Sequence, residues 1–201
     1  MRKNSVRQMT QLAMLSAILF VMAQTPLGYF RTPILSVSFL TVPVAIGAIL
    51  LGPVAGAVLG TIFGLTSFAG AFAGQGLTAM MLNINPVACF VCTVGARFLC
   101  GLCCGLIFSG LDRVFHGKKL AYVLAAVSCP ACNTLFFMGS LMLLYGHTAY
   151  IQNLCAQYHV ANPAALAIAL VGVQGLVELV CCGAMATAIC IPVSRYTGKK
   201  K

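Results

Sequence analysis

Two charged residues, Arg97 and Glu178, lie deep inside long apolar stretches of this sequence. The amide residues Asn133 and Gln174 have similarly apolar surroundings. A guanidinium is a planar fork of N–H donors that matches a carboxylate, whereas amides can bind hydroxyl or amide groups. This set of groups indicates a binding site for a small anionic molecule. The residues predicted to bind it are Arg97, Asn133, Gln174 and Glu178, with Asn85 and Gln75 closing the site from a neighbouring loop.

The same two charges could instead have a structural role. A charged side chain at the centre of a membrane costs about 2.5–3.5 kcal/mol on insertion scales, so such residues are rare unless they are paired or functional. An ion pair between Arg97 and Glu178 would neutralise both charges and join two helices. The sequence leaves both roles open for this pair.

Eleven cysteines suggest a second kind of chemistry. Three pairs have the CxxC spacing, and they are Cys89–Cys92, Cys100–Cys103 and Cys129–Cys132. A membrane thiol-disulfide oxidoreductase using Cys129 and Cys132 is therefore the alternative function from another class. However, each pair lies in an apolar stretch, where cysteine acts as a small hydrophobic residue, and a reactive thiol needs a positive, partly exposed setting. We expect neither redox chemistry nor a metal site.

Enzymatic activity is disfavoured because the sequence has few groups that could perform it. Two acidic residues cannot build a multi-carboxylate metal site, and neither an HExxH motif nor a nucleophile elbow occurs. The phosphate-binding motif GxxxxGK[ST] is also missing, so we expect that the chain does not itself drive ATP-dependent pumping. We expect no enzyme activity and no cofactor, and active uptake would need energy from another protein.

The composition indicates which elements must position these residues. Of the 201 residues, 61% are hydrophobic and only 7% are charged, whereas soluble domains carry roughly 25% charged residues. Because so few charges cannot cover a water-exposed surface, lipid must surround most of the chain. Each crossing takes about 20 apolar residues, so six helices use the whole length. We expect an all-α, multi-pass protein of the cell membrane, with residues 1–201 forming a single transmembrane substrate-binding domain.

Proline, glycine, asparagine and charged residues divide the sequence into six apolar segments. Irregular segments at 25–38, 69–86 and 147–163 alternate with a tight Gly52-Pro53 turn and a basic mid-chain loop. With a rise of 1.5 Å per residue, the four polar residues of the spans lie roughly 15–21 Å from the ends next to the irregular segments. The predicted helices cover about 8–24, 39–51, 53–68, 87–111, 120–146 and 164–191.

The net charge of +10 indicates topology. Ten of the twelve basic residues gather at the N-terminus, in the mid-chain loop and at the C-terminus. Basic residues stay on the cytoplasmic side because they resist translocation. We therefore place both termini in the cytoplasm and the irregular segments outside, and expect contact with the lipid bilayer but not with nucleic acid. The clusters are Arg2, Lys3 and Arg7; Arg113, Lys118 and Lys119; and Arg195, Lys199, Lys200 and Lys201.

Small residues recur at helical spacing in the first and third predicted helices. The third helix has a glycine every four residues, at Gly52, Gly56, Gly60 and Gly64. Such a stripe allows a neighbouring backbone to approach closely, so we interpret it as internal packing. The first helix has a small-residue face that suits packing or partner docking equally, formed by Ala13, Ser16 and Ala17.

Two segments of the sequence resemble a known family. Residues 11–29 (QLAMLSAILFVMAQTPLGY) and 36–68 (SVSFLTVPVAIGAILLGPVAGAVLGTIFGLTSF) are similar to the S components of energy-coupling factor (ECF) transporters. The resemblance implies a six-helix membrane protein that binds a vitamin or related micronutrient with high affinity. Ala13-x-x-x-Ala17 matches the small-residue motif through which this family docks on its membrane partner.

The resemblance also implies partners and a mechanism. A membrane coupling subunit and two cytoplasmic ATPases of an ECF module would power uptake. The outer loops would close over the vitamin, and the subunit would then topple in the membrane to release it inside. The segments TPLG and SVSFLTVP are most similar to those of pantothenate-type members. Pantothenate has a carboxylate, hydroxyls and an amide, which suit a site formed by an arginine and amide side chains. Riboflavin, another vitamin or a queuosine precursor are the alternative ligands.

Overall fold

The computed structural model describes residues 2–25, 28–31, 36–74, 76–115, 119–157 and 163–196. Helices make up most of this part, with one short antiparallel hairpin, so the predicted all-α fold is confirmed. The elements in chain order are α1 (Arg2–Gln24), β1 (Tyr29–Arg31), β2 (Ser36–Ser38), α2 (Thr41–Leu51), α3 (Pro53–Phe72), α4 (Gly76–Ile84), α5 (Pro86–Phe90), the π-helical turn η1 (Val91–Gly95), α6 (Ala96–Phe115), α7 (Lys119–Tyr145), α8 (Ala149–Gln157) and α9 (Pro163–Tyr196).

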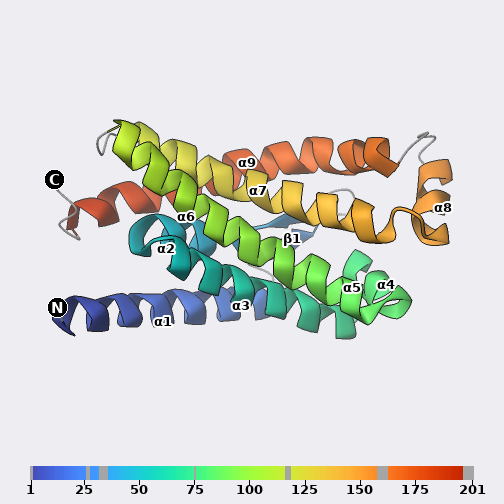
Figure 1. The fold of residues 1–201 in the computed structure, drawn as a ribbon, viewed down its shortest axis with the longest axis horizontal. Helices are drawn as coiled ribbons and strands as arrows, with labels where there is room; N and C mark the ends of the chain where they lie inside the picture. Colours follow the sequence, from blue (N-terminus) through green and yellow to red (C-terminus); the bar gives the residue numbers. More distant parts are fainter. Residues whose placement is uncertain are drawn as a thin grey trace.

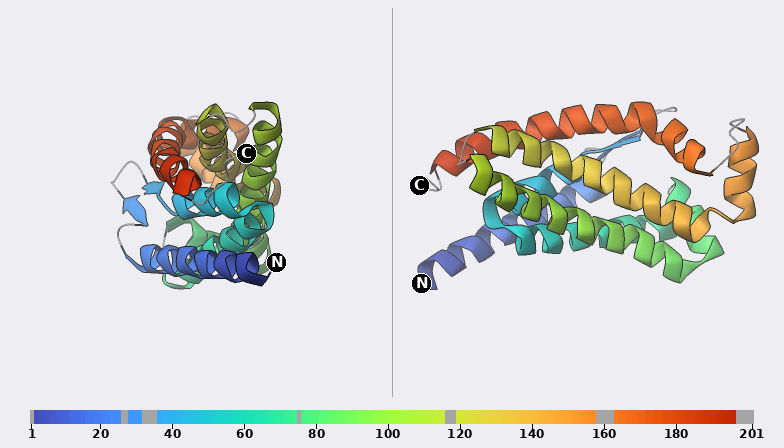
Figure 2. Two further views of the ribbon diagram at one scale, coloured as in Figure 1. Left: turned by 90° about the vertical axis from the view of Figure 1, so that its left-hand side faces the viewer. Right: turned by 45° about the horizontal axis from the view of Figure 1, so that its top comes forward.

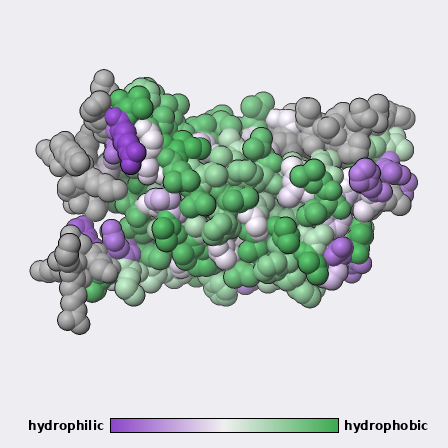
Figure 3. All heavy atoms as spheres, viewed as in Figure 1, coloured by the Kyte–Doolittle hydropathy of each residue, from purple (hydrophilic) through white to green (hydrophobic). Residues whose placement is uncertain are grey.

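Five helices within the described residues are long and apolar enough to cross a membrane. The face seen in Figure 3 is apolar over its middle, and hydrophilic residues gather towards its two ends. Large apolar side chains such as Val54 and Leu143 are 75% and 82% exposed, which a lipid environment explains. The five spans are Val6–Gln24, Pro53–Phe72, Pro86–Phe115, Lys119–Tyr145 and Gly175–Ser194.

The second predicted span, 39–51, is shorter than a crossing requires. Its helix, α2, begins only at Thr41 and has 11 residues. At 1.5 Å per residue this gives about 17 Å of helix, against a hydrocarbon core of about 30 Å. Residues 41–49 are all buried, because α2 contacts α3, α6, α7 and α9 in the middle of the bundle. The structure therefore makes α2 a core helix and not a lipid-facing one.

The main helices pack in chain order, α3 against α6, α6 against α7 and α7 against α9. α1 lies along α3 at the outside of the bundle (Figures 1 and 2). The start of α1, the end of α6, the start of α7 and the end of α9 share one end of the molecule, on the left of Figure 1. Basic Arg7, Arg113 and Lys119 belong to these elements. That this end faces the cytoplasm stays a prediction.

The segments predicted to be irregular contain secondary structure of their own. Segment 25–38 contains the β1–β2 hairpin, 69–86 contains the end of α3 and all of α4, and 147–163 contains α8. Strands of three residues and helices of nine are too short for hydrophobic periodicity to reveal them. Figure 1 shows α4 and α8 at the end of the molecule opposite to the start of α1.

Three glycines of the predicted stripe bring α3 into backbone contact with η1 and α6. A side chain at Gly60 would meet the carbonyl oxygen of Arg97, and side chains at Gly56 and Gly64 would also meet backbone atoms of the facing helix. The packing interpretation is confirmed for these three residues. Gly52 is different, because it forms the α2–α3 turn with φ of 104° and no described atom lies within 4 Å of a Cβ built there.

Candidate functional site

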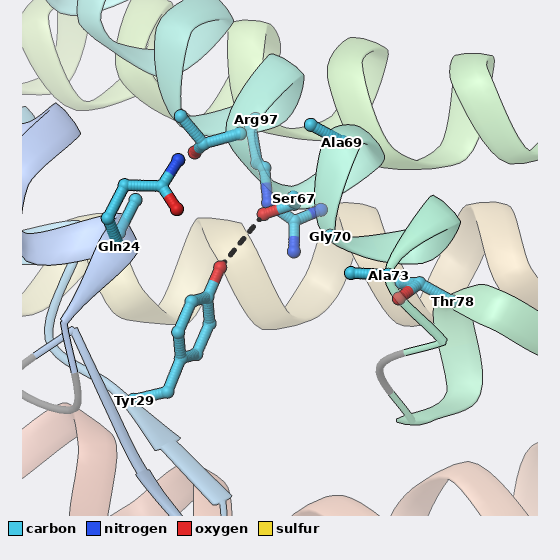
Figure 4. Close-up of a pocket in the computed structure, with 10 residues that line it drawn as sticks. Gln24, Tyr29, Ser67, Ala69, Gly70, Ala73, Thr78 and Arg97 are labelled. Atoms are coloured by element: carbon cyan, nitrogen blue, oxygen red, sulfur yellow. Dashed lines mark hydrogen bonds between the residues drawn. The ribbon is translucent and has the colours of Figure 1, made fainter.

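A cavity of about 200 Å³ lies between the ends of α1 and α3, strand β1, helix α4 and the start of α6. Pockets for drug-sized molecules measure roughly 300–1,000 Å³, so this cavity suits a smaller ligand. Figure 4 shows its side chains, with Tyr29 and Gln24 on one side and the Arg97 guanidinium on the other. Arg97 is the only charged side chain among the described lining residues, which are Ala23, Gln24, Tyr29, Thr66, Ser67, Ala69, Gly70, Ala73, Thr78 and Arg97.

The side chain of Arg97 is buried and held in place by uncharged groups. Its Nη1 donates a hydrogen bond to the backbone carbonyl of Thr93 at 3.1 Å. Its guanidinium carbon lies 4.7 Å from the ring centre of Phe63 and 4.9 Å from that of Phe137, distances at which a cation attracts an aromatic face. The Nε atom has no hydrogen-bond partner within the described structure. The guanidinium is thus oriented, but not saturated with acceptors.

A π-helical turn, η1, interrupts the helix immediately before Arg97. Such turns disturb the regular backbone hydrogen bonding and frequently occur at functional sites. The Thr93 carbonyl accepts from Arg97, and the Thr93 hydroxyl donates to the carbonyl of Cys89 at 2.7 Å. This turn therefore helps to set the direction in which the Arg97 side chain leaves the helix. No feature of the sequence predicted it.

The β1–β2 hairpin closes one side of the cavity. Tyr29 pairs with Ser38 across the hairpin, and the hydroxyls of Tyr29 and Ser67 are 3.1 Å apart, joining the hairpin to α3 (Figure 4). Neither Tyr29 nor Ser67 is among the site residues predicted from the sequence. The sequence showed only that Tyr29, an aromatic residue with a hydroxyl group, lies in the loop segment 25–38 near polar residues.

Glu178 lies near Arg97 without forming an ion pair with it. Its side chain is 5% exposed and accepts a hydrogen bond from the backbone of Ser38. Although the two charges are within electrostatic reach, no nitrogen of Arg97 comes within 4.0 Å of a Glu178 oxygen in the described structure. A direct ion pair, the structural role considered for these residues, is therefore not formed.

Three cysteines from different helices converge beneath the site. The thiol of Cys100 in α6 lies 3.7 Å from that of Cys129 in α7 and contacts the Cys129 carbonyl at 3.3 Å. Cys129 in turn contacts the carbonyl of Thr41 at 3.7 Å, and Cys182 in α9 contacts that of Ser38 at 3.5 Å. Together these contacts define a thiol layer, formed by Cys100, Cys129 and Cys182.

Three predicted site residues lie on one side of the thiol layer, each about one helical turn along its own helix from the nearest of these cysteines. They are Arg97, Asn133 and Glu178. Arg97 is three residues before Cys100, Glu178 four before Cys182, and Asn133 four after Cys129. Because α7 runs opposite to α6 and α9 (Figure 1), these offsets point the same way. Each corresponds to about 4.5–6 Å along a helix. The structure thus brings three of the predicted site residues to one level.

Of the remaining predicted site residues, only Asn85 has a side chain that the structure describes. Asn85 is exposed and caps α5, its Oδ1 accepting from the backbone N–H groups of Val87 and Ala88 at 3.1 Å each. Such a side chain satisfies donors at a helix start, and Asn85 does not line the cavity. Gln75 lies outside the described residues, and the described part of Gln174 is its backbone within α9.

The predicted docking face of α1 is accessible. Ala13 and Ala17 are exposed, and Ser16 is half-buried with its hydroxyl donating to the carbonyl of Leu12 at 2.9 Å. The whole span Val6–Gln24 is only slightly buried inside the molecule. Packing within the chain therefore leaves most of this face uncovered.

The CxxC pairs do not form the arrangement of a dithiol active site. The described residues include all eleven cysteines, and each is a free thiol. Cys129 is fully buried and its thiol contacts Cys100 of another helix, not Cys132. No group of three or more metal-binding side chains occurs in the described part of the chain. These thiols pack helices together as small hydrophobic residues.

Comparison with known proteins assigns the chain to a class of transport components. The family model described as "ECF transporter, substrate-specific component" matches residues 7–191. The comparison with curated proteins finds no match.

Proposed function

Because the chain belongs to the family of substrate-specific components of ECF transporters, we propose that it captures a small anionic vitamin, with pantothenate as the best match. Family membership makes it the substrate-binding subunit of an ECF transporter in the cell membrane. It also makes the chain a transport component and not an enzyme, working with the membrane and ATPase subunits of an ECF module. The ligand and the residues that bind it are our proposal.

The observation that supports an anionic ligand is the surroundings of the Arg97 side chain. Arg97 is 8% exposed and lines the cavity. Its guanidinium has a carbonyl and two aromatic rings as neighbours but no paired carboxylate in the described structure. A buried charge is unfavourable unless it is paired. A carboxylate entering the cavity would supply that pair in the geometry that a guanidinium fork prefers.

The size and lining of the cavity also support one of the vitamins considered over the others. Its volume of about 200 Å³ favours a narrow acid over the flat three-ring system of riboflavin. Arg97 would repel a queuosine precursor that carries an amine. Pantothenate combines one carboxylate with an amide and two hydroxyls, and hydroxyl and amide groups of Gln24, Ser67 and Thr78 line the same cavity.

Equilibrium binding tests this assignment with two ligands that differ only at the charged group. We expect the purified protein in detergent to bind pantothenate, measured by titration calorimetry, more tightly than pantothenol, in which an alcohol replaces the carboxylate. A hydrogen bond to a charged group contributes about 1.5–3 kcal/mol. Loss of a two-bond pair therefore corresponds to a preference of roughly 100-fold or more.

Arg97→Gln should abolish this preference, because glutamine keeps the polarity of the position but removes the charge. Arg113→Gln is the matched control, since Arg113 is exposed at the far end of the same helix. It should keep the wild-type ratio of the two affinities. A wild-type protein that binds the alcohol as tightly as the acid would reject an anionic ligand.

For the transport step we propose that the coupling subunit docks on the exposed face of α1 that contains Ala13 and Ala17. The small side chains would let a partner helix approach the α1 backbone closely. The ligand would be enclosed from the side of the β1–β2 hairpin, α4 and α8, and released at the opposite, cytoplasmic end after the subunit topples. ATP hydrolysis by the module supplies the energy for this step.

A further inference from the structure

We propose that Ser38, Asn133 and Glu178 form a second subsite, which binds hydroxyl groups at the end of the ligand opposite to its carboxylate. This acceptor subsite rests on the proposed function, because it describes the same bound molecule. It narrows the substrate class from any small acid to an acid with hydroxyl donors at its far end.

The acceptor subsite is recognised by buried oxygen atoms that lack a hydrogen-bond partner. Ser38 Oγ, Asn133 Oδ1 and Glu178 Oε1 are all buried without one in the described structure. The Asn133 and Glu178 side chains are 8% and 5% exposed. Buried acceptors are normally satisfied, and an unsatisfied one indicates a strained or functional position. Three of them together indicate a place where donors are expected.

Contacts within the fold place the residues that carry these three oxygens at one level of the bundle. The backbone of Ser38 hydrogen-bonds Glu178, so the Ser38 hydroxyl belongs to the immediate surroundings of that carboxylate. Asn133 lies on α7, which packs directly against α9. Asn133 and Glu178 each lie one helical turn from the thiol layer, and both lie on the same side of it. The three residues thus come from β2, α7 and α9 to one level of the bundle.

The hairpin connects this level to the cavity. Tyr29, which lines the cavity, is the strand partner of Ser38, and paired strands are about 5 Å apart. Arg97 lies between the two regions, because it lines the cavity and is also within electrostatic reach of Glu178. A ligand anchored at Arg97 would therefore extend along the hairpin, from the cavity beside Tyr29 towards Ser38.

The charges fix the direction in which such a ligand binds. Arg97 offers only donors, and a carboxylate such as Glu178 offers only acceptors when ionised. A ligand carboxylate would be repelled by Glu178 and attracted by Arg97, whereas a ligand hydroxyl can donate a hydrogen bond to Glu178. An acid with carboxylates at both ends would be excluded. In pantothenate, the carboxylate would meet Arg97 and the two hydroxyls would meet Glu178, Asn133 and Ser38.

The test compares pantothenate with its dideoxy analogue, in which hydrogen replaces both hydroxyls, by titration calorimetry on the full chain. We expect wild-type protein to bind pantothenate about 10- to 100-fold more tightly than the analogue, since hydrogen bonds to a charged acceptor are lost. In Glu178→Gln this ratio should fall about tenfold while affinity for the analogue is retained. The pantothenate-to-pantothenol ratio, which reports on Arg97, should not change.

Asp112→Asn is the matched control. Asp112 is the only other acidic residue of the chain and is exposed at the end of α6, so the variant makes the same chemical change away from the site. It should keep all three affinities. If Glu178→Gln does not fold, Asn133→Leu replaces the amide by an apolar group of similar size and should lower the same ratio.

Each result bears on one of the two claims. An unchanged hydroxyl ratio in Glu178→Gln, or an equal loss of affinity for both ligands, would overturn the acceptor subsite and leave the anionic cavity standing. A wild-type protein that binds pantothenate and its dideoxy analogue equally would do the same. No binding of pantothenate by the wild type would overturn the proposed function, and this inference with it.

Discussion

A methyl group added at Gly60 should disturb both the bundle and the ligand site. A Cβ built there meets the carbonyl oxygen of Arg97 and lies 3.0 Å from its carbonyl carbon and 3.4 Å from Cα of Phe98. Overpacking of this kind costs about 1–3 kcal/mol, whereas replacing glycine by alanine in a helix gains about 1 kcal/mol. We expect Gly60→Ala to change stability by between about 0 and −2 kcal/mol.

Gly110→Ala is the control, because Gly110 is in the same helix as Arg97 but exposed, with no described atom within 4 Å of its Cβ position. It should gain about 1 kcal/mol, so the two variants should differ by about 1–3 kcal/mol in denaturant unfolding. Gly60→Ala must also shift the backbone that carries the guanidinium. Loss of one charge-assisted hydrogen bond would weaken pantothenate binding about tenfold or more.

The reasoning is refuted if Gly60→Ala is as stable as Gly110→Ala and binds pantothenate with wild-type affinity. That result would mean that α3 and α6 are not in backbone contact at Gly60 and that this contact does not position Arg97. Loss of stability with unchanged affinity would retain the packing and reject only its link to the ligand.

Three further predictions concern the hairpin, the docking face and the thiols. Tyr29→Phe removes the hydrogen bond to Ser67 and should weaken pantothenate binding about 2- to 10-fold; unchanged affinity and dissociation rate would show that this bond does not hold the cavity closed. Ala13→Trp should block vitamin uptake by cells while the purified protein binds pantothenate normally, with the neighbouring exposed Met14→Trp as control; uptake by Ala13→Trp at the control's rate would remove this face as the docking surface. A maleimide mass-tag on denatured, unreduced protein should label all eleven cysteines. Fewer labelled cysteines would indicate a disulfide and support a dithiol function.

Residue type and spacing were sufficient to predict the membrane class and to single out two buried charged residues of the candidate site. Arg97 and Glu178 could be recognised because a charge in an apolar stretch is costly, whatever the details of the fold. The close packing of α3 against a neighbouring backbone followed from the four-residue spacing of Gly56, Gly60 and Gly64, because helical periodicity places such residues on one face. The structure identifies that neighbour as η1 and α6. These predictions depend on composition and on the helical spacing of residues, so they can be made without knowing side-chain rotamers.

Other features depend on tertiary contacts that the sequence does not encode locally. The CxxC spacing suggested partners within one helix, but Cys129 faces Cys100, because the facing helix decides which thiols meet. Whether Arg97 would pair with Glu178 or line a cavity depended on side-chain directions. The hairpin that brings Tyr29 to the cavity has strands of three residues, which are too short to show alternation.

Mass spectrometry of the small molecule that co-purifies with the protein in detergent tests most directly whether Arg97 binds an acidic nutrient. We predict a hydroxyl-bearing carboxylic acid, pantothenate foremost, in preparations of the wild type and of Arg113→Gln, and its loss from Arg97→Gln. A neutral or cationic molecule, or an acid that Arg97→Gln retains in full, would contradict the account.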